Sequence, residues 1–209
     1  MFIPLVDVLR CPVPHEETWL VASIDRAADR DIVEGMLGCP RCLAEYAIHE
    51  GVVLFAPDVE RPAYRPPNED DAMRLAAALD LTDARTTALL QGDWGVHAPI
   101  VAGMSPAQLI LVNAPDGITS GFGISLVRAT TAPLAHGSVG AAAFDATATP
   151  EMIASLVASL RGGGRLLGPA SRDVPAGLTE LARDDEVWVA ELASSGTTSS
   201  PIQLERRAR

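Results

Sequence analysis

The sequence contains no lysine, and all sixteen of its basic residues are arginines. We interpret this bias as a trace of GC-rich coding DNA rather than as chemistry. Acidic residues number 27, so the net charge is −11 and the sequence pI is about 4.7. Proteins that bind nucleic acid need a basic face for the phosphates, so direct nucleic-acid binding is not expected. The short basic run at residues 205–209 is typical of a solvated tail.

Long apolar runs and paired cysteines are also lacking. No segment approaches the 18 uninterrupted apolar residues that indicate a membrane helix. The opening residues, MFIPLVDVLRCP, lack the basic and apolar regions of a signal peptide. Three cysteines are an odd number, and without an export signal they favour metal ligation or free thiols over a disulfide framework. We therefore expect a cytoplasmic protein that does not enter a membrane.

A length of 209 residues is enough for one large or two small domains. Hydrophobic residues make up 48% of the chain, which is enough to form a buried core. Residues 56–68 contain four prolines, which predicts a semi-rigid connection. The predicted organisation is a small module at residues 1–57, a linker at 58–68, a larger domain at 69–192 and a flexible tail at 193–209.

Two cysteine-bearing knuckles mark the first module. Cys39 and Cys42 form a Cys-x-x-Cys turn that can present two thiolates to one Zn²⁺ ion. Cys11 and His15 could complete a tetrahedral Cys₃His site. Such a site has no open position for a substrate, so its role would be structural. In the alternative interpretation, the module folds without metal and the cysteines pack as small hydrophobic residues.

The segments around these knuckles favour strands. Residues 18–23 have strand character, and residues 46–48 and 52–55 predict a hairpin with its turn at residues 50–51. Residues 25–37 form a charged insertion with weak helical spacing, in which Ile32, Val33 and Met36 would share one side.

This module resembles the Trm112-like zinc-ribbon family. The matching residues are Leu9-Arg10-Cys11-Pro12, Cys39-Pro40-Arg41-Cys42, Tyr46-Ala47-Ile48 and Gly51-Val52-Val53-Leu54. The family usually has a second cysteine near Val13 or Pro14, and this chain has none. We expect His15, at a wider spacing, to take its place.

The larger domain alternates short apolar runs with helical patterns, which predicts a Rossmann-like α/β fold with a mostly parallel sheet flanked by helices. Helices are expected at residues 69–81, 97–103, 150–160 and 178–183. Strands are expected at residues 87–90, 108–113, 125–129, 139–144, 165–168 and 186–191. Thr149 is the expected N-cap of the third helix, and residues 161–164 are expected to end it.

Residues 126–145 and 150–167, with 86–95, resemble class I S-adenosylmethionine-dependent methyltransferases in sequence order. The resemblance implies a cofactor crevice formed by Gly92, Asp93, Gly95 and Asn113. The chain departs from that family where Trp94 replaces a glycine of the first turn and where Asn113 replaces the carboxylate that would hold the ribose. The family's Asp after the third strand is replaced around residues 130–131, and its Phe-Asp pair becomes residues 139–140.

No residue near the expected crevice is an evident base or nucleophile, and His97 and His136 are expected on the surface or in loops. We therefore predict a methyltransferase-fold protein without catalytic residues, which serves as a binding, regulatory or scaffold protein for a protein partner. An active methyltransferase with an atypical cofactor loop remains the alternative. A homo-oligomeric structural subunit that associates through an apolar face is a third interpretation.

Overall fold

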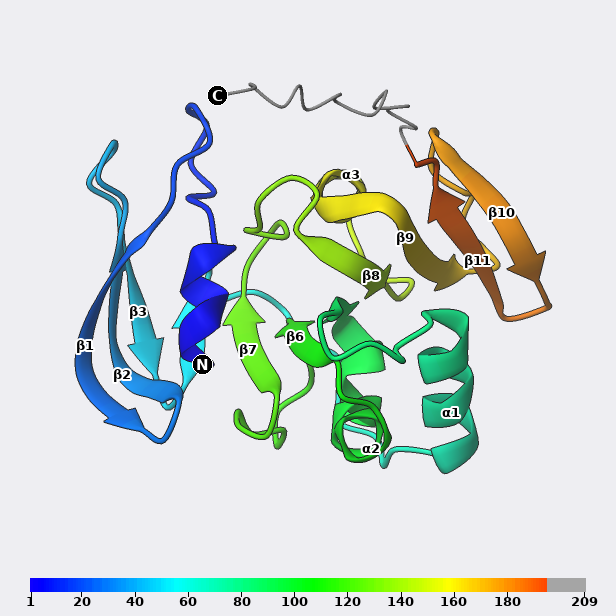
Figure 1. Cartoon of the computed structure of the whole chain (residues 1–209), viewed down its shortest axis with the longest axis horizontal. Coiled ribbons are helices and arrows are strands. Elements are labelled where there is room, and N and C mark those ends of the chain that lie inside the picture. Colours follow the sequence, from blue (N-terminus) through cyan, green and yellow to red (C-terminus); the bar gives the residue numbers. More distant parts are fainter. Residues whose placement is uncertain (195–209) are drawn as a thin grey trace, which may run out of the picture.

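The computed structural model describes residues 1–194. Its strands form one eleven-stranded sheet in the order β1-β2-β3-β4-β7-β6-β5-β8-β9-β11-β10 (Figure 1). The strands are β1 Val21–Ala28, β2 Asp31–Gly38, β3 Glu45–His49, β4 Val52–Leu54, β5 Thr87–Gln91, β6 Gln108–Val112, β7 Ile124–Arg128, β8 Val139–Ala143, β9 Leu160–Pro169, β10 Leu178–Arg183 and β11 Val187–Leu192. The helices are α1 Glu69–Ala78, α2 Ala98–Met104 and α3 Pro150–Ser159, with 3₁₀ turns η1 Ile3–Asp7 and η2 Gly92–His97.

The centre of the sheet is parallel. Strands β4, β7, β6, β5, β8 and β9 pair in parallel, and antiparallel strands extend both edges. Strands β5, β6 and β7 are buried almost throughout, as is typical of a sheet covered on both faces. The expected Rossmann-like α/β class is confirmed.

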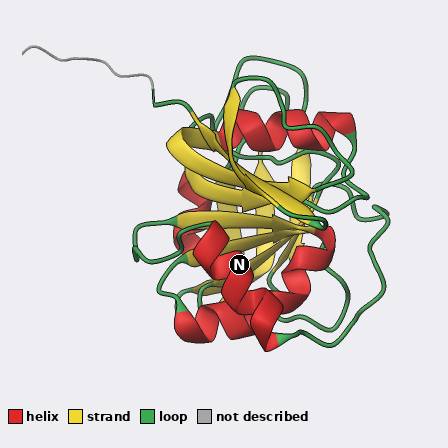
Figure 2. Cartoon of the chain, turned by 90° about the vertical axis from the view of Figure 1, so that its right-hand side faces the viewer, coloured by secondary structure: helices red, strands yellow, loops and turns green. Residues whose placement is uncertain are grey.

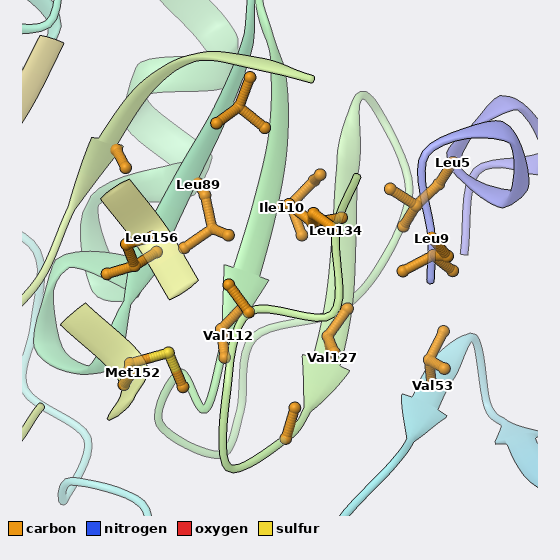
Figure 3. Packing of buried hydrophobic residues seen from close by; sticks show 14 of the residues in the cluster. Leu5, Leu9, Val53, Leu89, Ile110, Val112, Val127, Leu134, Met152 and Leu156 are labelled. Atoms are coloured by element: carbon orange, nitrogen blue, oxygen red, sulfur yellow. The ribbon is translucent and has the colours of Figure 1, made fainter. Parts of the chain in front are cut away.

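Helices cover both faces of this sheet (Figure 2). On one face, side chains of η1 and α3 join alternate residues of β5, β6 and β7 in a single hydrophobic cluster (Figure 3). On the other face, α1 and α2 pack against the intervening strand residues. The alternation follows from the two-residue period of a strand.

The direction in which the chain adds strands reverses at β5. The chain passes from β5 to β6 and β7 on one side, and then to β8 and β9 on the other. Diverging loops at such a reversal leave a crevice at the carboxyl ends of the strands, where open α/β sheets bind ligands.

The N-terminal hairpins belong to the same sheet. Strand β4 pairs in parallel with β7, with Val53 opposite Val127, and the backbone N–H groups of Phe55 and Ala56 donate to the carbonyl of Arg128. Val53 also lies in the hydrophobic cluster that contains Leu5 and Val127. The N-terminal strands therefore cover the β7 edge of the parallel sheet, which would otherwise expose unpaired backbone groups. The domain boundaries stay a prediction.

One expected helical insertion is wrong. Residues 25–37 lie in the antiparallel pair β1 and β2, which turns near Asp29 at a φ of +53°. Ile32 is buried while Met36 is exposed, so the residues assigned to one helical side do not share an environment. Pairing of β2 with β3 satisfies the backbone of this segment and outweighs a weak local helical pattern.

The helix expected at residues 178–183 is also wrong, because this segment is strand β10. It pairs with β11, which itself pairs with β9. Strand β10 is an edge strand with mostly exposed side chains, so little apolar patterning distinguishes it in the sequence. The expected stop at residues 161–164 is instead the irregular beginning of β9, where the register against β8 shifts.

The other expected elements are confirmed with small changes in their ends. The 45–54 hairpin turns at Glu50 and Gly51, both of which have positive φ. Helix α1 ends at Ala78 rather than residue 81, and Asn68 caps its start by accepting from the Asp70 N–H. Thr149 caps α3 as expected and accepts from the Met152 N–H at 3.2 Å. Of the tail, only residues 193 and 194 fall within the described residues.

Candidate metal centre and sheet crevice

Two separate segments bring the expected metal ligands together. Cys11 and His15 lie in the irregular chain between η1 and β1, and Cys39 and Cys42 form the turn between β2 and β3. The four ligand atoms all lie within 4.8 Å of one another. The Sγ atoms of Cys11 and Cys42 are 3.7 Å apart, and Cys39 Sγ is 3.5 Å from His15 Nε2.

Two of these separations, Cys11–Cys42 and Cys39–His15, match edges of a metal tetrahedron. With Zn–S bonds of about 2.3 Å and Zn–N bonds of about 2.05 Å, tetrahedral angles require S–S edges of about 3.8 Å and S–N edges of about 3.6 Å. The observed distances agree with both. Three thiolates and one imidazole therefore form a cluster that can hold a metal ion with no ligand position left open.

Neighbouring groups orient two of the ligands. His15 Nδ1 lies 2.6 Å from the carbonyl oxygen of Glu16, which can only accept, so Nδ1 carries the proton and Nε2 presents its lone pair to the cluster. The Tyr46 hydroxyl, on β3, lies 3.3 Å from Cys11 Sγ and can donate to the thiolate. The Tyr46 ring packs on Phe55 with centroids 4.6 Å apart, and this contact helps to fix its position.

The thiols differ in their protonation. Burial raises the pKa of Cys39, but the N–H groups of Cys42 and Arg41 outweigh this effect and lower the pKa to about 6. Burial raises the pKa of the Cys11 thiol, and the Tyr46 hydroxyl partly opposes that rise. Burial also raises the pKa of Tyr46, so this group stays protonated as a donor. Cys39 is therefore ready to ligate a metal at neutral pH.

The glycine-bearing turn after β5 is closed by Asp145, the second residue after β8. The Asp145 carboxylate accepts from the Asp93 N–H at 2.7 Å, and a Cβ added at Gly92 would overlap it. Gly92 has a φ of +65°. The Trp94 indole N–H donates to the Phe144 carbonyl at 3.1 Å. The two residues that follow β8 therefore pack directly against this turn.

Gly95 has a packing role in the same turn. A Cβ at Gly95 would overlap the side chain of Ala114, which follows β6. The glycine lets η2 lie directly against the end of that strand.

Asn113 is bonded within the protein. Its side-chain Nδ2 donates to the Ala129 carbonyl at 2.7 Å, and its Oδ1 accepts from the Ala129 N–H at 3.0 Å. Asn113 is 5% exposed and has a φ of +54°. Its amide therefore joins the carboxyl ends of β6 and β7.

A cavity of about 540 Å³ lies at the carboxyl ends of β5 to β8, where the strand order reverses. Asn113 is the one expected cofactor residue that lines it. Its wall is rich in threonines, and the Pro-rich segment covers one side; the lining comprises Val59, Glu60, Arg61, Pro62, Gln91, Asn113, Ala129, Thr130, Thr131, Thr147, Ala148, Thr149, Glu151 and Met152.

A second cavity, of about 690 Å³, lies between α1, η2 and strands β9 and β11. Asp93 lines this cavity rather than the first, and its carboxylate pairs with Arg65 at 2.7 Å. His97 also lines it, but is 8% exposed, so the expected surface position of His97 is wrong. Burial lowers the pKa of His97. His136, with a side chain 79% exposed, lies on the surface as expected.

Sequence reasoning missed Asp145, Gln91 and Tyr46. Gln91 Oε1 accepts from the Asp145 N–H at 3.0 Å, so these two residues join the ends of the neighbouring strands β5 and β8. A polar residue at or just beyond the end of a buried strand is the signal that could have identified Gln91 and Asp145.

The described residues contain no helix long and apolar enough to cross a membrane.

No protein-family model matches this sequence, and no curated protein does. Among solved structures, the MycE methyltransferase of the mycinamycin biosynthetic pathway is 12% identical over 69% of this chain and 53% of its own, with a TM-score of 0.47. A putative S-adenosyl-L-methionine-dependent methyltransferase from Methanococcus maripaludis is 8% identical over 62% of this chain and 86% of its own, with a TM-score of 0.45.

Geranyl diphosphate C-methyltransferase from Streptomyces coelicolor A3(2) is 14% identical over 47% of this chain, with a TM-score of 0.39. This chain spans less than half the length of that enzyme, 44%. The chain is similar to these methyltransferases in the course of its α/β sheet, at a level that identifies neither an activity nor a cofactor.

Proposed function

We propose that this chain is a methyltransferase-like Rossmann protein without catalytic activity, whose N-terminal strands carry a structural zinc ion. Cys11, His15, Cys39 and Cys42 would hold the ion. The support for zinc is the donor set of three thiolates and one imidazole, together with spacings that suit a closed tetrahedron. The arrangement of the two knuckles around a hairpin is the reason to regard this module as Trm112-like.

The observation that carries the loss of catalysis is the pairing of Asn113 with Ala129. Both polar ends of the Asn113 amide are used by the Ala129 peptide group, so no charged acceptor and no free amide is left there for ribose hydroxyls. The Gly92 turn adds to this, because the Asp145 carboxylate stands where a close-approaching cofactor would lie. A cofactor bound there would displace these bonds, each worth about 1 kcal/mol or more.

A protein of this kind acts by binding. We propose a binding, regulatory or scaffold role in the cytoplasm, where thiol ligands stay reduced, for a protein partner or a second copy. The net charge of −11 makes a phosphate backbone an unsuitable partner.

One observation favours the alternative of an active methyltransferase with an atypical cofactor loop. The 540 Å³ cavity lies at the strand-order reversal, the usual ligand position in open α/β sheets. In that case Gln91 and the threonines of the cavity wall would replace the missing acid, and Asn113 would have to release Ala129.

Calorimetric titration with S-adenosylmethionine and with S-adenosylhomocysteine distinguishes the two candidates. We expect no heat of binding for either ligand, with protein that elemental analysis shows to contain one zinc ion per chain. Micromolar affinity for either ligand would overturn the loss of cofactor binding. Freshly purified, folded protein without bound metal would overturn the structural zinc site without affecting the first conclusion.

A further inference from the structure

The second cavity, of about 690 Å³, combines an apolar floor with a charged rim. Leu75 and Leu167 in its wall are buried, and two half-buried valines of β11 belong to the same apolar cluster. The charged side chains of the wall are more exposed, at 51% for Asp184 and 75% for Glu186. The cavity therefore suits an occupant that carries both apolar and charged side chains.

The rim has an excess of negative charge. The wall contains five carboxylates and two guanidinium groups: Asp71, Asp93, Asp145, Asp184, Glu186, Arg65 and Arg74. Arg74 alone contacts three of the carboxylates, at N–O distances of 2.9 Å, 3.3 Å and 3.9 Å. Burial lowers the pKa of His97, so this residue adds no positive charge at neutral pH. The excess of acids favours a cationic occupant.

His97 gives a second indication of an occupant. It lines the cavity and is 8% exposed, and its Nδ1 atom has no hydrogen-bond partner within residues 1–194. Buried polar groups are normally paired, so an occupant that reaches the ring would supply what the described chain does not.

The chain itself contains a segment of matching chemistry, at residues 201–209, which lie outside the described residues. Its sequence is PIQLERRAR, in which Ile202 and Leu204 are apolar and three arginines accompany one glutamate. Arg206 and Arg207 are the only two adjacent basic residues of the sequence. Apolar and cationic side chains in one short segment match the apolar floor and the acidic rim of the cavity.

The place where the described residues end lets this segment reach the cavity. A Cβ added at Gly163 would lie 3.4 Å from Ser194 Oγ, so Ser194 lies beside the first residues of β9. Leu167, in the cavity wall, is four residues further along β9 and so at most about 13 Å from Gly163. The chain between residues 194 and 201 spans up to about 23 Å when extended.

Tethering makes even a weak contact effective. A short connection holds the segment near the cavity at an effective concentration of about 1 mM. A contact with an intrinsic dissociation constant of about 0.1 mM would then keep about 90% of the molecules in the bound state. A separate molecule would have to reach a similar concentration, which favours the segment of the same chain as the occupant.

We propose that residues 201–209 bind in the second cavity of their own chain, with Ile202 and Leu204 on its apolar floor and Arg206 and Arg207 among its carboxylates. Bound in this way, the segment excludes other ligands from the cavity. The proposal is independent of the loss of cofactor binding, since the two carboxyl-end cavities share no lining residue.

Charge reversal on each side gives matched variants. Arg206→Glu combined with Arg207→Glu reverses the segment. Glu186→Arg reverses part of the rim at a side chain that is 75% exposed, so the fold should be kept. Asp25→Arg is the control, because Asp25 is an exposed acid on β1, at the opposite edge of the sheet.

Backbone ¹⁵N relaxation of the full chain would measure the order parameters of residues 202–207. We expect values of about 0.8 in the wild type and in Asp25→Arg, and values below about 0.6 in the reversed segment and in Glu186→Arg. Added salt should lower the wild-type values, because the charges of the rim are partly exposed. The indole N–H resonance of Trp94, which lines the cavity, should shift in the reversed segment, while that of Trp19 should not.

Combining the reversed segment with Glu186→Arg gives the sharpest result. The two changes create new pairs of opposite charge, so the order parameters should rise above those of the reversed segment alone. Low order parameters in the wild type would overturn the proposal, as would values that none of the substitutions changes. Values that increase with protein concentration would also overturn it, because they would show that the segment binds another copy.

Discussion

Asn113 and Ala129 form a two-bond clamp between the carboxyl ends of β6 and β7, with the Asn113 amide donating at 2.7 Å and accepting at 3.0 Å. The clamp is buried, and Asn113 adopts a left-handed backbone that few non-glycine residues tolerate as well as asparagine. Its role is to hold two neighbouring strands together at the edge of the crevice.

The Asn113→Asp substitution tests this role. A carboxylate cannot donate to the Ala129 carbonyl and would repel it, so we expect a loss of about 1–3 kcal/mol in the free energy of unfolding. Urea denaturation would measure the loss, with Asn68→Asp at the exposed cap of α1 as the control that keeps its acceptor. A stable Asn113→Asp protein that gains affinity for S-adenosylmethionine would contradict the clamp and favour the alternative function.

Removal of the metal should destabilise the whole chain, and not only the two segments that carry the ligands. Strand β4 carries the N-terminal hairpins onto β7, so loss of the metal weakens the cover on one edge of the parallel sheet. We expect a strong chelator, or Cys39→Ser, to lower the midpoint of thermal unfolding of the whole chain. Scanning calorimetry would show it, and His49→Ala, at an exposed histidine outside the cluster, should leave the midpoint nearly unchanged. A midpoint indifferent to chelation would argue against a bound structural metal.

Tyr46 should act on the metal through Cys11. The Tyr46→Phe substitution removes the hydroxyl at 3.3 Å from the Cys11 sulfur and keeps the ring on Phe55. We expect zinc affinity to fall about 10-fold or more, the effect of losing a partner to a metal ligand, with the fold retained. Competition with a chromophoric chelator measures the affinity. The control is Tyr64→Phe, at the other tyrosine of the chain, which is exposed. Equal zinc affinities in the two variants would show that the Tyr46 hydroxyl does not act on the metal.

His97 should make stability depend on pH. Burial lowers the pKa of His97 below the ordinary histidine value of about 6.5, so over the range between these two values the unfolded chain binds a proton that the folded chain does not. Neutral His97 therefore costs no stability above about pH 6.5. As the pH falls below that value, the free energy of unfolding decreases by no more than about 1.4 kcal/mol per pH unit.

Urea unfolding between pH 7.5 and 5 would measure this dependence, with metal content followed in parallel because acid also protonates the ligands. We expect the slope to become shallower in His97→Gln and to stay unchanged in His136→Gln, since His136 is exposed. If the free energy of unfolding varied with pH equally in the wild type and in His97→Gln, His97 would be protonated in the folded chain as readily as in the unfolded chain.

Local patterns predicted several elements correctly. The hairpin of β3 and β4 is marked by alternating residues and a turn at Glu50 and Gly51, and α3 by its Thr149 cap and apolar spacing. The buried strands β5, β6 and β7 read as short apolar runs because both faces of the sheet are covered. Strands β2 and β10 were missed because their backbone partners, rather than their own residues, decide their conformation.

The four residues of the candidate metal site were named from residue type and spacing, and the structure brings them together. The tuning of that centre by Tyr46, and the closure of the crevice by Asp145, were not predictable in this way. Each depends on contacts between residues 35 and 52 positions apart along the chain.

By itself, the sequence determined the α/β class, the buried strands and the four residues of the candidate metal site, since these follow from local periodicity, composition and donor chemistry. Only the tertiary structure decided that β4 extends the sheet at β7 and that both polar atoms of the Asn113 amide bond to Ala129. These relationships join residues distant in sequence, whose proximity follows from the packing of the whole sheet and its helices.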